Sequence, residues 1–253
     1  MRRIYLVAPV AAFTLTLSAV SPAALYAQDE APINTVIERL RQGEPAIGTF
    51  TRAPRPDLDF AVIDTQYGEF DIDAVRRAVV ALRGGPGVPA VTPIVRIPLA
   101  VRDAPQDVVR QLLEVGVSGV MFPDIETREQ AIASVASIRS HTGLWPADPS
   151  GTLVAMLQIE TLAGIEHLDE ILDVPGIGVI FLGPTDLATS AGLDGPNDPR
   201  VDALVQGVLE VCLATGIPCG YPIVASSPED AERQTARRLA EGFKVLAVMT
   251  TAR

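Results

Sequence analysis

The sequence predicts an α/β fold, a TIM (β/α)8 barrel, on three observations. Strand-like and helix-like segments alternate along the chain, with short Gly, Pro and Asp turns between them. Eight strand-like runs follow the amino-terminal segment, which is the barrel number. Several runs are apolar at successive positions, as expected for strands covered on both faces. No G-x-G-x-x-G turn follows any strand, which argues against an open doubly wound sheet.

A leading helix is expected over residues 33–41, and the strands then follow along the chain. They are expected near residues 46–50, 60–66, 91–97, 118–122, 152–160, 178–183, 218–223 and 244–250. The helices between them begin after residues that favour a helix start. Asp71 precedes 72–82, residues 103–106 precede 108–115, Thr127 precedes 128–139, and Ser226 or Ser227 with Pro228 precedes 229–241. The sequence stops just past the last strand, so we expect the eighth helix to be absent.

Residues 1–27 have the pattern of a secretory signal peptide. A basic pair opens the chain, residues 4–20 are apolar and uncharged, and residues 21–27 are rich in small side chains. We therefore expect cleavage near Ala27, a single barrel domain over residues 28–253, and a secreted or periplasmic location. An uncleaved anchor is the alternative, and the choice between the general and twin-arginine export routes stays open.

The mature chain is strongly acidic. Two of the 20 basic residues lie in the signal segment, so 18 basic residues face 31 acidic ones, a net charge of −13. Such a surface repels nucleic acid and anionic lipid, and no other stretch is long and apolar enough to cross a bilayer. We expect a small-molecule partner, no nucleic acid and no membrane after signal cleavage. A homo-oligomer stays open.

Cysteine, lysine and histidine usage restricts the chemistry. Cys212 and Cys219 permit a disulfide, and two buried free thiols are the other interpretation. The single lysine, Lys244, stands at the start of the last strand, opposite to the expected site. Because Schiff-base chemistry needs a desolvated lysine in the site, a lysine-dependent aldolase is disfavoured. His141 and His167 are interpreted as a loop residue and an exposed helix residue rather than as ligands.

Two carboxylates follow apolar runs in the middle of the chain. Glu160 closes the run over 153–157, and Asp186 follows the run over 179–182. In a parallel barrel both reach the same carboxyl-terminal rim, where close like charges stay ionised only with a cation between them. Hard oxygen ligands suit Mg²⁺ or Mn²⁺, so a divalent metal is the predicted cofactor. Taken singly, each residue would be interpreted as a helix cap.

Polar residues close most of the predicted strands. In chain order they are Asp64-Thr65-Gln66-Tyr67-Gly68, Val95-Arg96-Ile97-Pro98, Pro123-Asp124, Gln158-Ile159-Glu160-Thr161 and Gly183-Pro184-Thr185-Asp186-Leu187. Together this set resembles the HpcH/HpaI aldolase/citrate lyase family, the metal-dependent class II pyruvate aldolases. The resemblance runs from the Gly48 strand to Ala191-Gly192, and the runs around Glu160 and Asp186 are its most specific parts.

The resemblance implies a barrel of the phosphoenolpyruvate/pyruvate-binding type, which cleaves or forms a carbon–carbon bond next to a pyruvate enolate. The substrate would be a 2-oxo acid or a 4-hydroxy-2-oxo acid. Glu160 and Asp186 would bind the metal, and Arg96 would hold the carbonyl oxygen and stabilise the enolate. Substrate binding would also involve Gln158, Gly183, Pro184 and Thr185, the glycine allowing close approach of the backbone.

The sequence departs from the family pattern at the catalytic base. Family members carry a glutamate and a histidine after the strand-two aspartate, and the histidine, coupled to that aspartate, accepts the proton. Here Gln66 and Tyr67 follow Asp64 at those positions. A tyrosine pKa of about 10 against about 6.5 for histidine is a handicap of about 4 kcal/mol at neutral pH. The predicted catalytic residues are therefore Arg96, Asp64 and Tyr67.

Two further departures concern the rim and the carboxyl terminus. Where this chain has the short connection 140–146, the family has an Arg-Tyr-Pro-rich covering loop, and its eighth helix often packs on a neighbouring subunit. We therefore expect the lid and the usual dimer contact to be missing. Two alternatives to a 2-oxo-acid lyase stay open. One is a catalytically impaired barrel that binds a metal and an oxo acid, and the other is a malyl- or citramalyl-type lyase.

Overall fold

The computed structural model describes residues 34–53, 55, 57–84, 90–139 and 143–251. These residues belong to one compact unit, 32–253. The predicted signal peptide, residues 1–27, and His141 lie outside the described residues. The signal peptide and the domain boundary at residue 28 therefore stay predictions. Within the described ranges, no helix has both the length and the apolar character needed to span a bilayer.

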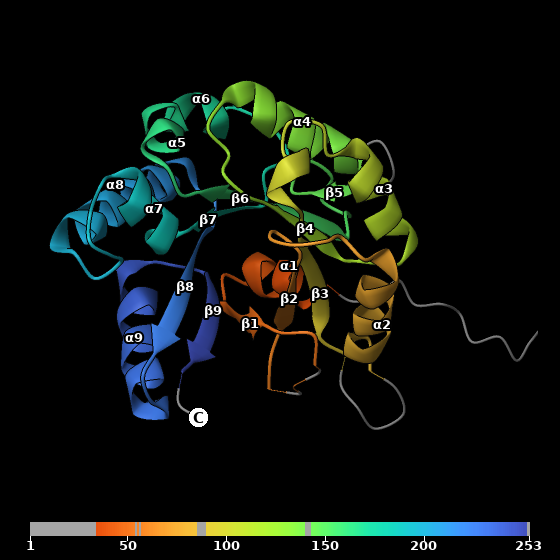
Figure 1. Cartoon of the computed structure of the whole chain (residues 1–253), viewed down its shortest axis with the longest axis horizontal. Coiled ribbons are helices and arrows are strands. Elements are labelled where there is room, and N and C mark those ends of the chain that lie inside the picture. Colours follow the sequence, from red (N-terminus) through yellow and green to blue (C-terminus); the bar gives the residue numbers. More distant parts are fainter. Residues whose placement is uncertain (1–33, 54, 56, 85–89, 140–142, 252–253) are drawn as a thin grey trace, which may run out of the picture. The chain divides into compact units, whose positions relative to one another are not determined.

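Eight parallel strands close into a barrel, as predicted (Figure 1). Each strand pairs with the next along the chain, β4 pairs directly with β6, and β9 pairs with β1 to complete the circle. The strands are β1 Ala46–Phe50, β2 Phe60–Asp64, β3 Thr92–Arg96, β4 Gly119–Phe122, β6 Leu153–Ile159, β7 Val179–Leu182, β8 Cys219–Ala225 and β9 Val245–Thr250.

A short ninth strand, β5 Leu144–Trp145, was not predicted. It pairs in parallel with the first two residues of β6. Two residues are too few to produce a periodic pattern, so the sequence alone reads this segment as a connection. The last strand is β9, and no helix follows it among the described residues.

Helices connect the strands on the outside of the barrel (Figure 1). They are α2 Ile72–Leu82, α3 Gln106–Glu114, α4 Arg128–Arg139, α5 Leu162–Glu166, α6 Leu168–Leu172, α7 Pro184–Ser190, α8 Pro199–Thr215 and α9 Pro228–Glu241, with a short 3₁₀ helix at Leu99–Val101. The predicted starts at Asp71, Thr127 and Ser227 are confirmed, because each side chain accepts a hydrogen bond from an amide of the first turn. In contrast, α3 begins two residues earlier than predicted, after Pro105 and without a side-chain cap.

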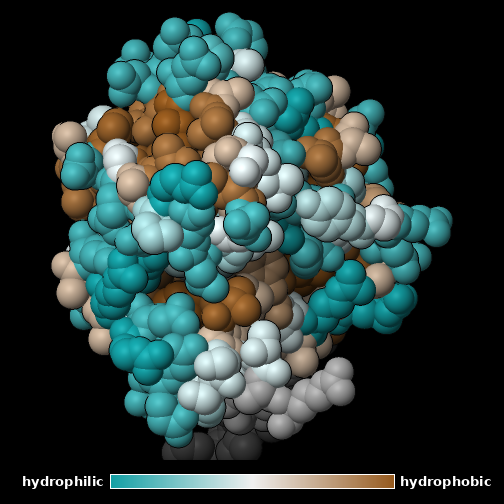
Figure 2. Space-filling model, turned by 60° about the vertical axis from the view of Figure 1, so that its left-hand side comes forward, coloured by the Kyte–Doolittle hydropathy of each residue, from teal (hydrophilic) through white to brown (hydrophobic). Residues whose placement is uncertain are grey.

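The core has two layers because successive strand residues point to opposite faces. Along β2, Ala61 and Ile63 face the helices and join the larger apolar cluster. Phe60 and Val62 face the barrel axis and join a smaller cluster inside the barrel. Figure 2 shows the side of the barrel that carries α8 and α9, where hydrophilic side chains cover most of the surface and apolar ones emerge in separate patches.

The leading helix α1, Thr35–Arg41, closes the amino end of the barrel. Its Val36 and Ile37 are buried in the interior cluster. Asn34, directly before the helix, donates from Nδ2 to the Ser118 and Thr152 carbonyl oxygens at 2.8 and 2.9 Å, just ahead of β4 and β6. The opposite end of the barrel, at the carboxyl ends of the strands, is therefore the end left for a site.

The possible disulfide and the single lysine both concern side chains away from the carboxyl end of the barrel. Cys212 and Cys219 are free and buried, so the disulfide is not formed. Lys244 Nζ donates to the Gly43 carbonyl oxygen at 2.8 Å, beside α1. The lysine thus lies at the amino end, as predicted, and does not line the cavity described below.

Candidate active site

The carboxyl ends of the strands surround a cavity of about 430 Å³. This volume is typical of small-molecule sites. Eight of the residues predicted for the site line it: Asp64, Arg96, Gln158, Glu160, Gly183, Pro184, Thr185 and Asp186. Much of the remaining lining is apolar. Three further polar lining residues, Asn197, Tyr221 and Gln234, were not predicted, because none of them ends a strand.

Asp64 holds Arg96 in one orientation. The two residues are register partners on β2 and β3, and Arg96 Nε and Nη2 donate to the two Asp64 carboxylate oxygens at 2.9 and 2.5 Å. The Phe50 ring centroid lies 4.9 Å from the guanidinium carbon. Burial favours the neutral form of Asp64, but hydrogen bonds from Arg96 and the Gln66 amide bring its pKa below the ordinary value. The pair therefore presents a fixed guanidinium to the cavity.

Glu160 follows β6 and has no exposed surface. One of its carboxylate oxygens accepts a hydrogen bond from the Asp124 amide and the other accepts one from Gln158 Nε2, each at 3.1 Å. Burial and the adjacent Asp124 carboxyl group raise the pKa of Glu160 to about 8, and the Asp186 charge adds to this shift. In the absence of a cation, Glu160 is therefore mainly protonated at neutral pH.

The start of α7 packs directly against Glu160. A Cβ atom at position 183 would overlap the Glu160 carboxylate, so Gly183 is required for this approach. Asp186 lies in the first turn of α7. Burial and the Asp124 charge raise its pKa, while Arg96 acts in the opposite direction. The two predicted metal ligands therefore line one cavity, and burial raises the pKa of both.

These residues fit a divalent cation. Glu160 and Asp186 supply hard oxygen atoms, and Gln158 Oε1 is buried without a hydrogen-bond partner. Arg96 is the cationic side chain of the lining, and Asp64 already neutralises it. A cation would offset the repulsion between the carboxylates and give the Gln158 oxygen a partner. Among the described residues, no three His, Cys, Asp or Glu side chains are already gathered as a metal cluster.

Tyr67 differs from the other predicted site residues because it does not line the cavity. The residue is 68% exposed. Partial desolvation raises the pKa of its phenol, as do the Asp186 and Glu160 charges, and Arg96 only partly opposes them. Its neighbour Gln66 is buried, and Gln66 Oε1 has no hydrogen-bond partner. The two positions that depart from the family pattern thus differ from one another, one exposed and one enclosed.

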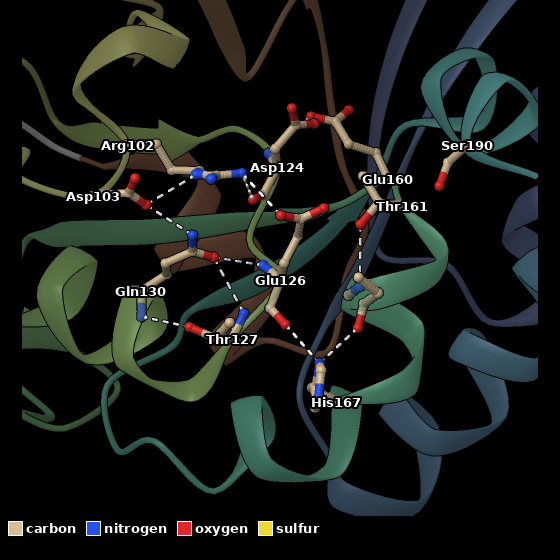
Figure 3. A network of polar contacts seen from close by, with 12 residues as sticks. Arg102, Asp103, Asp124, Glu126, Thr127, Gln130, Glu160, Thr161, His167 and Ser190 are labelled. Carbon is tan, nitrogen blue, oxygen red and sulfur yellow. Dashed lines mark hydrogen bonds and ion pairs between the residues drawn. The ribbon is translucent and has the colours of Figure 1, made fainter.

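Asp124 is a further residue near the site for which the sequence predicted no role. It lies two residues after the end of β4 and is the one non-glycine residue with a positive φ, +48°, among those the structure describes. Figure 3 shows its carboxyl group next to that of Glu160. The available sequence signal was an acidic residue directly after an apolar strand, the same signal that marked Glu160 and Asp186.

His167 is half-buried, and the prediction of an exposed residue is wrong. Its Nδ1 lies 3.0 Å from the carbonyl oxygens of Glu126 and Ala163 (Figure 3). The side chain thereby links the loop after β4 to the end of α5. It is a structural residue and not a ligand of the cavity, which it does not line.

Comparison with known proteins shows the same fold and related sequences. The 5-keto-4-deoxy-D-glucarate aldolase of Citrobacter koseri is 31% identical over 195 residues, which cover 70% of this chain and 72% of that protein. An HpcH/HpaI aldolase/citrate lyase family protein from Burkholderia cenocepacia J2315 superposes with a TM-score of 0.67 at 23% identity, covering 86% of this chain and 92% of that one. CitE from Mycobacterium tuberculosis, solved in complex with magnesium and acetate, gives a TM-score of 0.57 at 21% identity, covering 83% and 87%.

The family model of HpcH/HpaI aldolase/citrate lyase matches residues 49–251. This range contains all eight barrel strands except the first three residues of β1, together with every residue predicted for the site. The match agrees with the resemblance seen in the strand-end residues. The chain therefore belongs to the HpcH/HpaI aldolase/citrate lyase family, a family of carbon–carbon lyases.

Proposed function

We propose that this protein is a metal-dependent carbon–carbon lyase that acts on a 2-oxo acid, in particular a 4-hydroxy-2-oxo acid, through a pyruvate enolate. The observation that carries the proposal is the composition of the cavity. A fixed guanidinium, Arg96, and two carboxylates with raised pKa values, Glu160 and Asp186, line one cavity at the carboxyl ends of the strands. That combination suits an anionic oxo acid together with a divalent cation.

The chain's own residues have distinct tasks in this proposal. Arg96 holds the substrate carbonyl oxygen and stabilises the negative charge that develops there, and Asp64 keeps the guanidinium in place. The amides of Thr185 and Asp186, which the first helical turn leaves free, receive the substrate carboxylate. Glu160 and Asp186 would hold Mg²⁺ or Mn²⁺, with Gln158 beside them. The metal would supply Lewis-acid polarisation of the keto acid.

The proposed cleavage breaks the bond between C3 and C4 of the substrate. The C4 hydroxyl loses its proton and becomes the aldehyde carbonyl, and the electron pair of the broken bond passes to C3 and the enolate. A proton added at C3 then gives pyruvate. The reaction therefore needs a group that accepts the hydroxyl proton.

Tyr67 is the proposed acceptor of the hydroxyl proton, because it stands at the sequence position of the family's base. Its pKa and its exposure make it a weak base. Its pKa is raised and the residue is largely exposed, so the phenol is protonated at neutral pH. Tyr67→His restores a group with a pKa of about 6.5 and should raise the rate of pyruvate release by a factor on the order of 100 or more. An unchanged rate would mean that the cavity serves another reaction. Tyr67→Phe is the matched control, and it should lower any residual activity.

The exposure of Tyr67 also favours a second candidate, a barrel that binds a metal and an oxo acid without turnover. Pyruvate release from a panel of 4-hydroxy-2-oxo acids separates the two. The first compound to test is 5-keto-4-deoxy-D-glucarate, the substrate in the name of the Citrobacter koseri relative. A lyase releases pyruvate, whereas a binder shows a thermal shift with pyruvate and Mg²⁺ but no product. Glu160→Gln should remove either response.

The proposed location outside the cytoplasm depends on residues 1–27. Their pattern of a basic start, an apolar stretch and small residues supports export. The full chain expressed in a bacterial host should be recovered from the periplasmic fraction, shortened near Ala27, and a chain starting at residue 28 should stay inside the cell. Recovery of the full chain unprocessed in the cytoplasm would reject the proposal.

A further inference from the structure

We propose that Asp124 is a third carboxylate of the cation site, so that this barrel binds its divalent metal with three acidic residues, Asp124, Glu160 and Asp186, rather than two. The inference rests on the proposed function as a metal-dependent enzyme and extends it.

The position of Asp124 is set by strand pairing. The strand β4 pairs with β3 on one side and with β6 on the other, and Phe122 is in register with Leu157, so Asp124 lies beside the end of β6. The Asp124 amide donates to one Glu160 oxygen at 3.1 Å, and the two carboxyl groups lie next to each other (Figure 3). Asp124 also contributes to the charge felt by Asp186. Its carboxyl group therefore lies against that of Glu160 and within electrostatic reach of Asp186, although the structure, in the residues that it describes, does not gather the three as a metal cluster.

The backbone conformation that aims Asp124 at Glu160 is held by side chains of the surrounding loop. A φ of +48° is uncommon for a residue with a side chain and persists where neighbours fix it. The Arg102 guanidinium donates to the Asp124 carbonyl oxygen at 2.9 Å and to the Glu126 carboxylate at 3.2 Å. On the other side, the Ile125 amide donates to the Gln158 carbonyl oxygen at 3.0 Å.

Two more side chains fix the rest of this loop (Figure 3). Gln130 Oε1 accepts hydrogen bonds from the amides of Glu126 and Thr127 at 2.8 and 3.2 Å. His167 Nδ1 contacts the Glu126 carbonyl oxygen at 3.0 Å. The loop is thus anchored on both sides of Asp124, and the residue has little freedom to turn away from Glu160.

An independent observation points to a missing ligand. Gln158 is 2% exposed and lines the cavity. Its Nε2 donates to Glu160, while its Oε1, on the same amide, has no partner. A buried acceptor left unpaired is costly, and a cation or a water held by a cation would satisfy it. The unpaired oxygen belongs to the group that already contacts Glu160, so it marks the same place as the carboxylates.

The positive charges near Asp124 are committed elsewhere. Arg96 pairs with Asp64. Arg102 contacts the Asp124 backbone, but its ion pairs go to Asp103 and Glu126. In the part of the chain that the structure describes, no ion pair reaches the Asp124 carboxylate. An acidic side chain held against a buried glutamate without a positive partner destabilises the cation-free protein, which is expected at a metal site.

The test is Mn²⁺ titration calorimetry on the full-length protein after treatment with a chelator. Asp124→Asn removes the charge and keeps a residue that tolerates positive φ. Asp124→Gly removes the whole side chain and is unstrained at this position. Glu160→Gln tests the proposed function, and Asp107→Asn, an exposed change of the same type on α3, is the control for net charge.

We expect both Asp124 variants to bind Mn²⁺ at least about tenfold more weakly than the wild type, with Asp107→Asn unchanged and Glu160→Gln showing no binding. Both Asp124 variants should also unfold at the same temperature as the chelator-treated wild type or above it. Wild-type affinity in Asp124→Asn and Asp124→Gly, with binding lost in Glu160→Gln, would overturn this inference and leave the proposed function standing. Absence of Mn²⁺ binding by the wild type would overturn both.

Discussion

The two ends of the barrel differ in how their polar groups are paired. At the amino end, Asn34 donates to the carbonyl oxygens that precede β4 and β6, and the apolar residues of α1 fill the interior beneath it. At the carboxyl end, Glu160 is equally buried, but its neighbours are other carboxyl groups, and Gln158 Oε1 has no partner. The same pair of strands, β4 and β6, thus carries a satisfied contact at one end and an unsatisfied one at the other.

This difference shows where the fold places stability and where it places chemistry. Buried polar groups that are hydrogen-bonded lower the free energy of the folded state, and such groups lie at the amino end. Buried like charges raise it, and they are retained where a ligand supplies the missing charge. Substitutions at the amino end should therefore change stability without changing ligand affinity, whereas substitutions at the carboxyl end should change ligand affinity.

The largest effect should come from removing the metal at different pH values. Glu160 has a pKa of about 8 against an ordinary value of 4.5. A carboxyl group whose pKa is raised by folding leaves stability intact while the pH is below its unfolded pKa, here 4.5. The free energy of unfolding then falls as the pH rises, until the pH passes the folded pKa of about 8. The loss in the metal-free protein is at most about 5 kcal/mol. Added Mg²⁺ should offset it.

Urea unfolding from about pH 5 to about pH 9, with chelator and with Mg²⁺, measures this loss. Other carboxylates titrate in the same range, so the informative quantity is the difference between the wild type and Glu160→Gln. That difference should grow in favour of the variant as the pH rises, because the glutamine stays neutral beside Asp124 and Asp186. A difference that does not depend on pH would show that Glu160 is not held in a raised-pKa environment.

The second effect is on the reaction and not on the fold. Arg96→Lys keeps the charge but loses the paired hydrogen bonds to Asp64. We expect kcat/KM for the best 4-hydroxy-2-oxo acid to fall by about 100- to 1,000-fold, equivalent to about 3–4 kcal/mol of transition-state stabilisation. The free energy of unfolding should change by less than about 1 kcal/mol, since one side of this pair is exposed. Full activity in the lysine variant would remove Arg96 from the proposed mechanism.

The sequence was sufficient for the barrel because each strand is an apolar run bounded by turn residues. It was also sufficient for the residues at strand ends, because parallel strands in a closed barrel bring all their carboxyl ends to one rim. Asp64, Arg96, Glu160 and Asp186 were found in this way, and the cavity contains all of them. Where the fold determines position directly, the pattern of residues is enough.

What could not be predicted depends on loop conformation. Asp124 carries the same signal as Glu160, yet its direction is decided by a positive φ and by Arg102, which comes from the segment after β3. Tyr67 occupies the position of the family's base, but the turn after β2 leaves it at the surface. Neither outcome follows from periodicity, because contacts far apart in the sequence select the loop geometry.

At the amino end, Asn34→Ala should cost about 2–3 kcal/mol of unfolding free energy. The variant loses two hydrogen bonds to the Ser118 and Thr152 carbonyl oxygens and the cap of α1 at the Ile37 amide. Ser227→Ala, which removes a single cap from the outer helix α9, is the control and should cost about 1 kcal/mol. Mn²⁺ affinity should stay at the wild-type value in both. A loss of affinity in Asn34→Ala would show that the two ends are coupled.

The smallest effect should come from the contacts that hold Asp124 in place. Arg102→Gln removes hydrogen bonds to the Asp124 carbonyl oxygen and to Glu126. We expect it to weaken Mn²⁺ binding about three- to fivefold and to lower the unfolding free energy by about 1 kcal/mol. Arg110→Gln, on the exposed face of α3, is the matched control and should change neither quantity.

The decisive measurement is the same substitution made together with Asp124→Asn. If Arg102 acts by directing the Asp124 carboxylate toward the cation, Arg102→Gln should have no further effect on affinity once that carboxylate is gone, while its effect on stability persists. Additive losses of affinity in the double variant would mean that Arg102 influences the site by another route. The two readouts together separate a residue that aims a ligand from one that only supports a loop.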